Sequence, residues 1–256
     1  MKQYFITGTD TEVGKTYVTC QLLKAAQQAS LTCIGYKPIS AGCEQVNGEW
    51  VNEDALNIQK ACSKIRENKA VSSVGDKKRE NAREKNEESG QTLPLHQINP
   101  IALRPPIAPH IAALEEGVAL TFENIAQGLD KLHAYQPDLL LMEGAGGWRL
   151  PLTLGDEYKP TYYLSDVVKA LNMDVILVVG MRLGCLNHAL LSAEAIRADG
   201  LTIKGWVAND ITGNMTRYQE NLHSLKAMLP EPLLAEIPYQ REPDEEALFA
   251  AIKQIS

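Results

Sequence analysis

The feature that most constrains the fold is a glycine-rich loop between a strand pattern and a helix pattern near the start of the chain. It reads GTDTEVGKT over residues 8–16 and follows the apolar run Tyr4 to Thr7. The backbone N–H groups of such a loop and the start of the next helix bind phosphate, while Lys15 reaches the β- and γ-phosphate oxygens and the Thr16 hydroxyl ligates Mg²⁺. Thr9 stands where the usual pattern has its first glycine. We predict a phosphate loop here, and not a glycine-rich turn that merely starts a helix.

Short apolar runs alternate with longer helical patterns along the rest of the chain. Most of the runs are almost continuously apolar, as in parallel strands that are covered on both faces, and the helical patterns fit right-handed crossovers. We predict a doubly wound, mostly parallel α/β sheet flanked by helices, in a single domain over residues 1–256. The predicted strands are Tyr4–Thr7, Thr32–Tyr36, Asp138–Met142, Asp174–Val179, Lys204–Ala208 and Leu233–Ile237, and the helices include Lys15–Ala29, Asn187–Ala198 and Thr216–Met228.

One stretch, at about 66–90, interrupts this alternation. It holds seven basic and six acidic residues and almost no large apolar ones. Such a segment buries too little apolar surface to order itself as core. We predict a mobile, solvated insertion with a surface helix over Asp76–Glu88, and a partner-binding segment is the alternative.

Composition excludes several classes of function. The net charge of -7 without any basic stripe disfavours nucleic acid as a partner. The longest apolar runs fall far short of the roughly 20 residues of a membrane helix, and the chain starts without a signal-peptide pattern. An odd number of cysteines without a C-x-x-C spacing is typical of reduced, packed thiols. We therefore expect a cytoplasmic protein without nucleic-acid or membrane partners; its cysteines are Cys20, Cys33, Cys43, Cys62 and Cys185.

Polar residues follow several of the predicted strands. Lys37 ends one strand and Glu143 ends another, and the carboxyl ends of parallel strands face the ligand crevice of an open sheet. Asn209 ends a third strand, and an asparagine can pair with adenine N6 and N7. Asp54 lies at the start of a helical pattern, where it either approaches the phosphates or belongs to a helix cap. The acid after the apolar strand is the expected site of a Mg²⁺-directed carboxylate.

Together, these segments resemble the dethiobiotin synthetase family. The similarity covers nearly the whole chain apart from about 66–90, and its motifs keep the family's order: the loop 8–16, GYKP over 35–38, EGAGGW over 143–148, LGCLNH over 183–188 and GWVAND over 205–210. The resemblance implies that CO₂ adds to one amine of 7,8-diaminopelargonate, that the carbamate attacks the γ-phosphate of ATP, and that the second amine closes the ring. Dethiobiotin, ADP and phosphate would be the products of this step of biotin biosynthesis.

The resemblance also implies roles for individual residues. Lys15 and Lys37 would stabilise negative charge during phosphoryl transfer, and Thr16, Asp54 and Glu143 would hold Mg²⁺. The implied ATP-binding residues are Glu12, Val13, Gly14, Lys15, Thr16, Tyr17, Asp54, Glu143, Gly146, Asn209, Asp210, Pro238 and Tyr239. The implied substrate-binding residues are Thr11, Lys37, Ala41, Gly144, Ala145, Gly184, Cys185, Leu186 and Asn187. The resemblance further implies a homodimer, in which residues 184–187 of one subunit reach the carboxylate of the diamine bound to the other subunit.

The sequence departs from the family pattern at two site positions. Ala41 stands where Ser or Thr is usual, four residues after Lys37, and Arg182 replaces a second lysine. Because side chains alternate along a strand, Lys37 and Ala41 share one face while Ser40 faces the other way. We therefore expect that Ser40 does not supply the missing hydroxyl.

Two other classes of P-loop protein remain as alternatives. Synthetases that amidate cobyrinic acid have a similar fold but need a glutaminase domain, for which no length remains. A ParA-like ATPase switch that binds a protein partner usually carries a lysine early in its loop, where this chain has Thr9-Asp10-Thr11. ATP hydrolysis measured with and without diamine and bicarbonate separates the synthetase from the switch.

Overall fold

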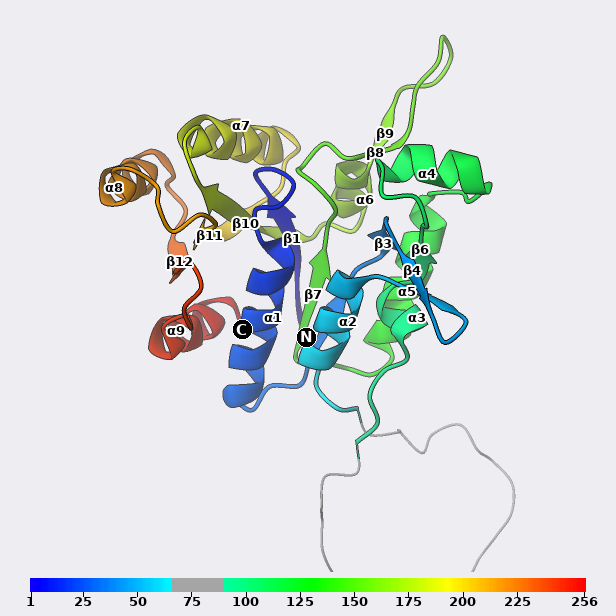
Figure 1. The fold of residues 1–256 in the computed structure, drawn as a ribbon, viewed down its shortest axis with the longest axis horizontal. Helices are drawn as coiled ribbons and strands as arrows, with labels where there is room; N and C mark the ends of the chain where they lie inside the picture. Colours follow the sequence, from blue (N-terminus) through cyan, green and yellow to red (C-terminus); the bar gives the residue numbers. More distant parts are fainter. Residues whose placement is uncertain (66–89) are drawn as a thin grey trace, which may run out of the picture.

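The computed structural model describes residues 1–65 and 90–256. The helix expected over Asp76–Glu88 lies outside these residues. The centre of the fold is a six-stranded, fully parallel sheet with the strand order β12-β11-β10-β1-β7-β2 (Figure 1). Its strands are β1 Lys2–Gly8, β2 Cys33–Tyr36, β7 Leu139–Glu143, β10 Asp174–Met181, β11 Ile203–Asp210 and β12 Leu233–Ile237.

Helices cover the sheet on both faces, as the apolar strands require. α1 (Lys15–Gln28) joins β1 to β2 and packs against α2 (Glu53–Ala61) and α9 (Glu245–Ile255). The chain runs in the opposite direction along the sheet through α7 (Cys185–Ala198) and α8 (Tyr218–Met228), so right-handed crossovers place these two helices on the other face. The other helices in the described part of the chain are α3 Leu95–Ile98, α4 Pro109–Glu116, α5 Phe122–His133 and α6 Leu164–Ala170.

Among the described residues, three two-stranded ladders accompany the central sheet. β3 (Ile39–Ser40) pairs with β6 (Ile101–Ala102) in parallel and extends the chain beyond β2. The antiparallel pairs are β4 (Glu44–Val46) with β5 (Glu49–Val51), and β8 (Pro151–Thr153) with β9 (Tyr162–Tyr163). Asn47-Gly48 between β4 and β5 is a local hairpin signal that sequence reasoning missed, whereas β3, β6, β8 and β9 are too short to carry a strand pattern.

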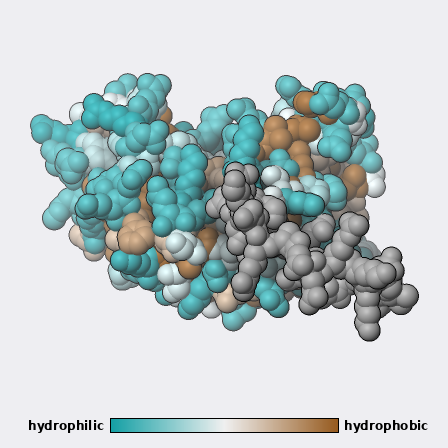
Figure 2. All heavy atoms as spheres, turned by 90° about the horizontal axis from the view of Figure 1, so that it is seen from below, coloured by the Kyte–Doolittle hydropathy of each residue, from teal (hydrophilic) through white to brown (hydrophobic). Residues whose placement is uncertain are grey.

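The core lies on both sides of the central strands. β7 is buried at every residue, and so are all residues of β10 after Asp174. This burial confirms the inference from continuous apolar runs, and the six predicted strands agree with the observed ones to within two residues at each end. The face seen in Figure 2 is largely hydrophilic with scattered apolar side chains.

The doubly wound α/β fold is therefore confirmed. All five cysteines are free and buried. Within residues 1–65 and 90–256, no helix combines the length and apolar character needed to cross a bilayer.

The carboxyl ends of the parallel strands define where a ligand binds. The connections after β1 and β10 leave these neighbouring strands in opposite directions, toward β2 and β11. A crevice forms at such a switch point outside the strand ends. The glycine-rich loop lies there, directly between β1 and α1.

Candidate active site

The glycine-rich loop has the backbone that a phosphate site requires. Gly14 adopts a left-handed conformation (φ 79°), and a side chain there would collide with the amide of Asn209. Asn209 Nδ2 donates to the carbonyl of Val13 at 2.8 Å, which ties the loop to the end of β11. α1 begins at the next residue, Lys15, so its free N–H groups point toward the crevice.

Two charged groups shape the loop from within. Lys15 is buried, and its Nζ donates to the carbonyl of Asp10 at 3.0 Å. The Asp10 carboxylate accepts from the Thr11 N–H at 2.8 Å and pairs with Arg182 at the end of β10. The arginine that replaces the family's lysine therefore contacts the loop.

The carboxylate of Glu143 is the centre of the site. It is fully buried at the carboxyl end of β7. Its Oε1 accepts from the Thr16 hydroxyl at 2.7 Å and from Lys37 Nζ at 2.7 Å, and its Oε2 accepts from the Thr19 hydroxyl at 2.7 Å. β7 lies between β1 and β2, so it brings the carboxylate to both the loop and the lysine at the end of β2.

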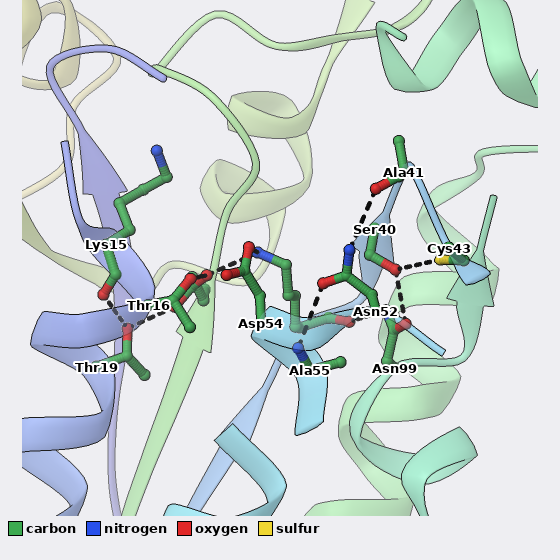
Figure 3. A network of polar contacts seen from close by, with 12 residues as sticks. Lys15, Thr16, Thr19, Ser40, Ala41, Cys43, Asn52, Asp54, Ala55 and Asn99 are labelled. Carbon is green, nitrogen blue, oxygen red and sulfur yellow. Dashed lines mark hydrogen bonds and ion pairs between the residues drawn. The ribbon is translucent and has the colours of Figure 1, made fainter. Parts of the chain in front are cut away.

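Lys37 joins the two candidate metal-binding carboxylates. It is 5% exposed, and its Nζ lies 2.7 Å from Glu143 Oε1 and 3.4 Å from Asp54 Oδ2. Asp54 is half exposed in the first turn of α2, where Asn52 caps the helix by accepting from the Ala55 N–H (Figure 3). The cap and the approach of Asp54 to the site, which the sequence left as alternatives, both occur.

The side chain of Ser40, three residues after Lys37, belongs to a buried network of hydrogen bonds. The Ser40 hydroxyl donates to Asn99 Oδ1 at 2.7 Å and lies 3.2 Å from the Cys43 sulfur (Figure 3). Asn99 Nδ2 donates in turn to the Lys37 carbonyl at 2.7 Å. Ser40 and the half-buried Ala41 both line the cavity, but the proton of the Ser40 hydroxyl is used by Asn99.

A cavity of about 1090 Å³ brings most of the predicted site residues together. The chain segments after β1, β2, β6 and β7, among others, and the facing sides of α1 and α2 form its walls. Of the predicted residues, Thr11, Glu12, Gly14, Lys15, Thr16, Tyr17, Lys37, Ala41, Asp54, Glu143, Ala145 and Gly146 line it.

The other predicted residues fall outside this cavity. Val13 is buried beneath the loop, and Gly144 packs against Phe5. Asn209 and Asp210 end β11, and Pro238 and Tyr239 follow β12, so these four stand at the strand ends on the far side of the loop. One of the two N–H donors of the Asn209 amide is used by the Val13 carbonyl, which leaves the second N–H and the carbonyl oxygen for a base. Gly184, Cys185, Leu186 and Asn187 form the start of α7 beside the fully exposed Leu183.

The two buried lysines have opposite electrostatic environments. Burial is the main cause that lowers the pKa of Lys15 to about 8, and the positive charge of Lys37 acts in the same direction. Burial also acts to lower the pKa of Lys37, but the charges of Glu143 and Asp54 outweigh it, so that pKa is raised. Cys20 lines the cavity as well, but burial raises the pKa of its thiol to about 12, which excludes a thiolate nucleophile near neutral pH.

The donor set suits a hard cation that is shared with a nucleotide. Thr16, Asp54 and Glu143 present only oxygen, and Mg²⁺ takes one or two carboxylates together with phosphate oxygens. No group of three or more His, Cys, Asp or Glu residues in the described parts of the chain could hold a metal by itself. The residues thus fit Mg²⁺ bound together with a phosphate, and not a resident metal in a protein-only cage.

Sequence reasoning missed several parts of the site. The Pro106–Pro109 segment lines the cavity, but a proline-rich loop between distant elements has no local signal for this. Asn99 supports the Lys37 carbonyl through a contact that only the fold creates. Thr19 could have been found, because it lies three residues after Thr16 and so on the same side of α1.

This fold and site define a P-loop protein that acts with a nucleotide. A family model described as an AAA domain matches residues 2–247. Among curated proteins, the chain is 73% identical to an ATP-dependent dethiobiotin synthetase BioD of Alteromonas mediterranea over the full length of both. It is 43% identical to the enzyme of that name from Aeromonas salmonicida, over 96% of this chain and 94% of that one.

Solved structures agree on the fold alone. A MinD cell division protein of Aquifex aeolicus, in its complex with MinC, superimposes with a TM-score of 0.54 at 12% identity, over 99% of this chain and 95% of that one. The MinD protein from the same organism gives 0.52 at 11% identity, over 99% and 96%. The sequence relatives are far more specific, and the chain belongs to the dethiobiotin synthetase family.

Proposed function

We propose that this chain is an ATP-dependent dethiobiotin synthetase that forms C–N bonds from 7,8-diaminopelargonate and CO₂. The observation that carries the proposal is the position of Lys37, which is buried at the end of β2 between Glu143 and Asp54. Lys37 lines the same cavity as the phosphate loop. A fixed cation at this position is suited to an anionic acceptor in line with a γ-phosphate. Membership of the family supplies the identity of the substrates.

The reaction proceeds through three bond-forming steps. One amine attacks CO₂ and gives a carbamate with loss of a proton. A carbamate oxygen then attacks the γ-phosphorus as the bond to ADP breaks, which forms a carbamic-phosphoric anhydride. Finally, the second amine attacks the carbamoyl carbon, closes the ring and expels inorganic phosphate.

The residues of the cavity divide these tasks. Lys15 and the loop N–H groups hold the nucleotide phosphates, and Lys37 stabilises the charge shared by the carbamate oxygen and the transferred phosphoryl group. Thr16, Asp54 and Glu143 would hold Mg²⁺, which would neutralise charge on the phosphate oxygens. Thr11, Ala41 and Ala145 line the diamine side, and the strand ends around Asn209 and Tyr239 hold adenine.

We also propose a cytoplasmic homodimer. Leu183 is 95% exposed and Leu191 on α7 is 57% exposed, next to the segment 184–187 that the family resemblance places at the partner's diamine. Apolar side chains of this size at one site favour a covered surface. Free, buried thiols and the use of ATP support the compartment. Light scattering of the purified chain measures the dimer directly.

Product formation tests the activity. With ATP, diamine and bicarbonate together, we expect ADP and dethiobiotin to form in equal amounts, measured by a coupled ADP assay and mass spectrometry. Leaving out either the diamine or the bicarbonate should reduce ADP formation to background. Hydrolysis of ATP at the same rate without either substrate would indicate an ATPase switch and overturn the proposal.

A further inference from the structure

The buried side of Glu143 is held by a residue that the proposed mechanism does not use. Thr19 is fully buried on α1, and its hydroxyl lies 2.7 Å from Glu143 Oε2. We infer that Thr19 is a positioning residue that orients the Glu143 carboxylate toward Mg²⁺. This inference rests on the proposed role of Glu143 as a metal ligand, and it deepens that proposal.

The two oxygens of Glu143 face different surroundings. Oε1 contacts Thr16 and Lys37, which both line the cavity. Oε2 contacts Thr19, which is not among the cavity-lining residues described. One oxygen is therefore turned to the ligand side of the site and the other to the helix interior.

A carboxylate in this place needs a donor on each side. The terminal torsion of a glutamate is broad, so the covalent chain alone does not fix which way the oxygens point. Glu143 is 0% exposed, so water is not available to replace a missing donor at Oε2. An unsatisfied charged oxygen in such a place is costly, and a carboxylate that lacks its inner donor turns toward the donors that remain.

Thr19 has a competing acceptor, and the geometry shows which one wins. Its hydroxyl also lies 2.9 Å from the Lys15 carbonyl, one turn earlier in α1. The hydroxyl carries a single proton, and a hydrogen bond to a charged oxygen is shorter and stronger than one to a neutral carbonyl. The shorter contact is the one to Glu143, so the proton is assigned to the carboxylate.

The remaining donors cannot take over this task. Thr16 and Lys37 both contact Oε1, and the mechanism directs both of them at the ligand: Thr16 at the metal and Lys37 at the carbamate. Thr19 is the donor to Glu143 that has no task on the ligand side. Loss of a group that hydrogen-bonds to a metal ligand typically lowers metal affinity by about 10–100-fold.

The test uses Thr19→Val, which removes the hydroxyl but keeps the shape, and Thr19→Ser, which keeps the hydroxyl. The readout is Mn²⁺ affinity in the presence of ADP, from the free-Mn²⁺ signal in electron paramagnetic resonance. We expect Mn²⁺ affinity about tenfold or more weaker in Thr19→Val and within about twofold of wild type in Thr19→Ser. ADP affinity without metal should be unchanged in both.

Ser63→Ala is the matched control for loss of a buried hydroxyl. Ser63 accepts from the Cys33 N–H at 2.9 Å, at the amino end of β2 and away from the cavity lining. We expect this variant to lower the thermal midpoint without weakening Mn²⁺ binding. If Thr19→Val does not fold, Thr19→Ala, which also lacks the hydroxyl, takes its place.

Three results would overturn the inference. Wild-type Mn²⁺ affinity in the variants without a hydroxyl would show that Oε2 needs no donor. Equal weakening in Thr19→Val and Thr19→Ser would assign the effect to packing. Failure of the wild-type chain to bind Mn²⁺ in the presence of ADP would show that these residues do not form a metal site. None of these measurements involves the diamine, so they stay separate from a failure to form dethiobiotin.

Discussion

The phosphate loop and the carboxyl end of β2 each present one buried lysine to the same cavity, but they hold it by different means. Lys15 Nζ donates to a backbone carbonyl, and burial lowers its pKa to about 8. Lys37 lies between two carboxylates, which raise its pKa. The difference shows how one residue type serves two tasks. A bound phosphate stabilises the positive charge of Lys15, which burial disfavours, whereas Lys37 stays charged with or without a ligand.

Replacing Lys37 is the strongest way to break this comparison. We expect Lys37→Ala to lower turnover by at least about a hundredfold, because it removes a preorganised charge at a phosphoryl transition state. ATP affinity should stay nearly intact, since Lys15 and the loop still hold the phosphates, whereas Lys15→Ala should harm both quantities. Steady-state kinetics and direct nucleotide titration measure the two effects.

Lys24→Ala is the matched control, because this exposed lysine lines the same cavity without contacting Glu143. It should keep turnover within about twofold. Normal turnover in Lys37→Ala would remove Lys37 from the catalytic machinery.

The pH dependence of ATP binding sharpens the comparison at the other lysine. The protonated form of Lys15 binds phosphate, so affinity should be full below pH 8 and should fall as the pH rises through about 8, the pKa of this lysine. Above that value the loss approaches about tenfold per pH unit for a single proton. Titration of the free enzyme with ATP from pH 6.5 to 9.5 measures it.

The variant Lys15→Arg distinguishes the titration of Lys15 from the titration of other groups. A guanidinium stays charged over the whole range, so the variant should bind more weakly but without the decline near pH 8. The same decline in wild type and variant would assign the titration to another group.

A smaller effect is expected on the cavity wall after Lys37. Ala41→Ser should raise kcat/KM for the diamine by up to about tenfold, because it adds a donor to a charged substrate group, less what a bound water already supplies. Ser40→Ala should leave catalysis almost unchanged and lower the free energy of unfolding by about 1–2 kcal/mol, since Asn99 Oδ1 loses its donor.

The two variants are assayed at subsaturating diamine and saturating ATP, with chemical denaturation in parallel. A clear catalytic loss in Ser40→Ala with no gain in Ala41→Ser would show that Ser40 serves the carbamate.

The smallest effect is expected from a change far from both lysines. Ile65 and Gln91 pair through two backbone hydrogen bonds of 2.9 Å each, and Ser63 bonds to the amino end of β2. A short Gly/Ser linker can therefore replace 66–90 and join ends that already lie side by side. We expect unchanged turnover and a thermal midpoint that barely moves. Loss of activity or of the dimer would show that the segment is functional.

The order and type of the main strands and helices could be predicted because buried strands are recognisable as apolar runs in the local sequence. β7 and β10 are almost uniformly apolar, and the glycine-rich loop fixes the strand–loop–helix unit at the start. The short pairs such as β3 with β6 depend on contacts between residues about sixty positions apart, and no local pattern encodes those.

The candidate site was predictable only in part, for the same reason. Lys37 and Glu143 were found because each directly follows an apolar strand, and strand ends converge in a parallel sheet. The hydrogen bond from Asn209 to the phosphate loop and the one from Asn99 to Lys37 depend on how distant segments pack. Asn209 thus gained a role in supporting the loop that its sequence context does not reveal.

The transfer of oxygen from CO₂ to phosphate tests the central claim most directly. If the carbamate attacks the γ-phosphorus beside Lys37, one carbamate oxygen must leave with the phosphate when the second amine closes the ring. Starting the reaction with ¹⁸O-labelled CO₂, and stopping it before exchange with water, we predict one ¹⁸O atom in each inorganic phosphate and the other label in the ring carbonyl, measured by mass spectrometry. Phosphate without ¹⁸O, beside fully labelled dethiobiotin, would contradict the account.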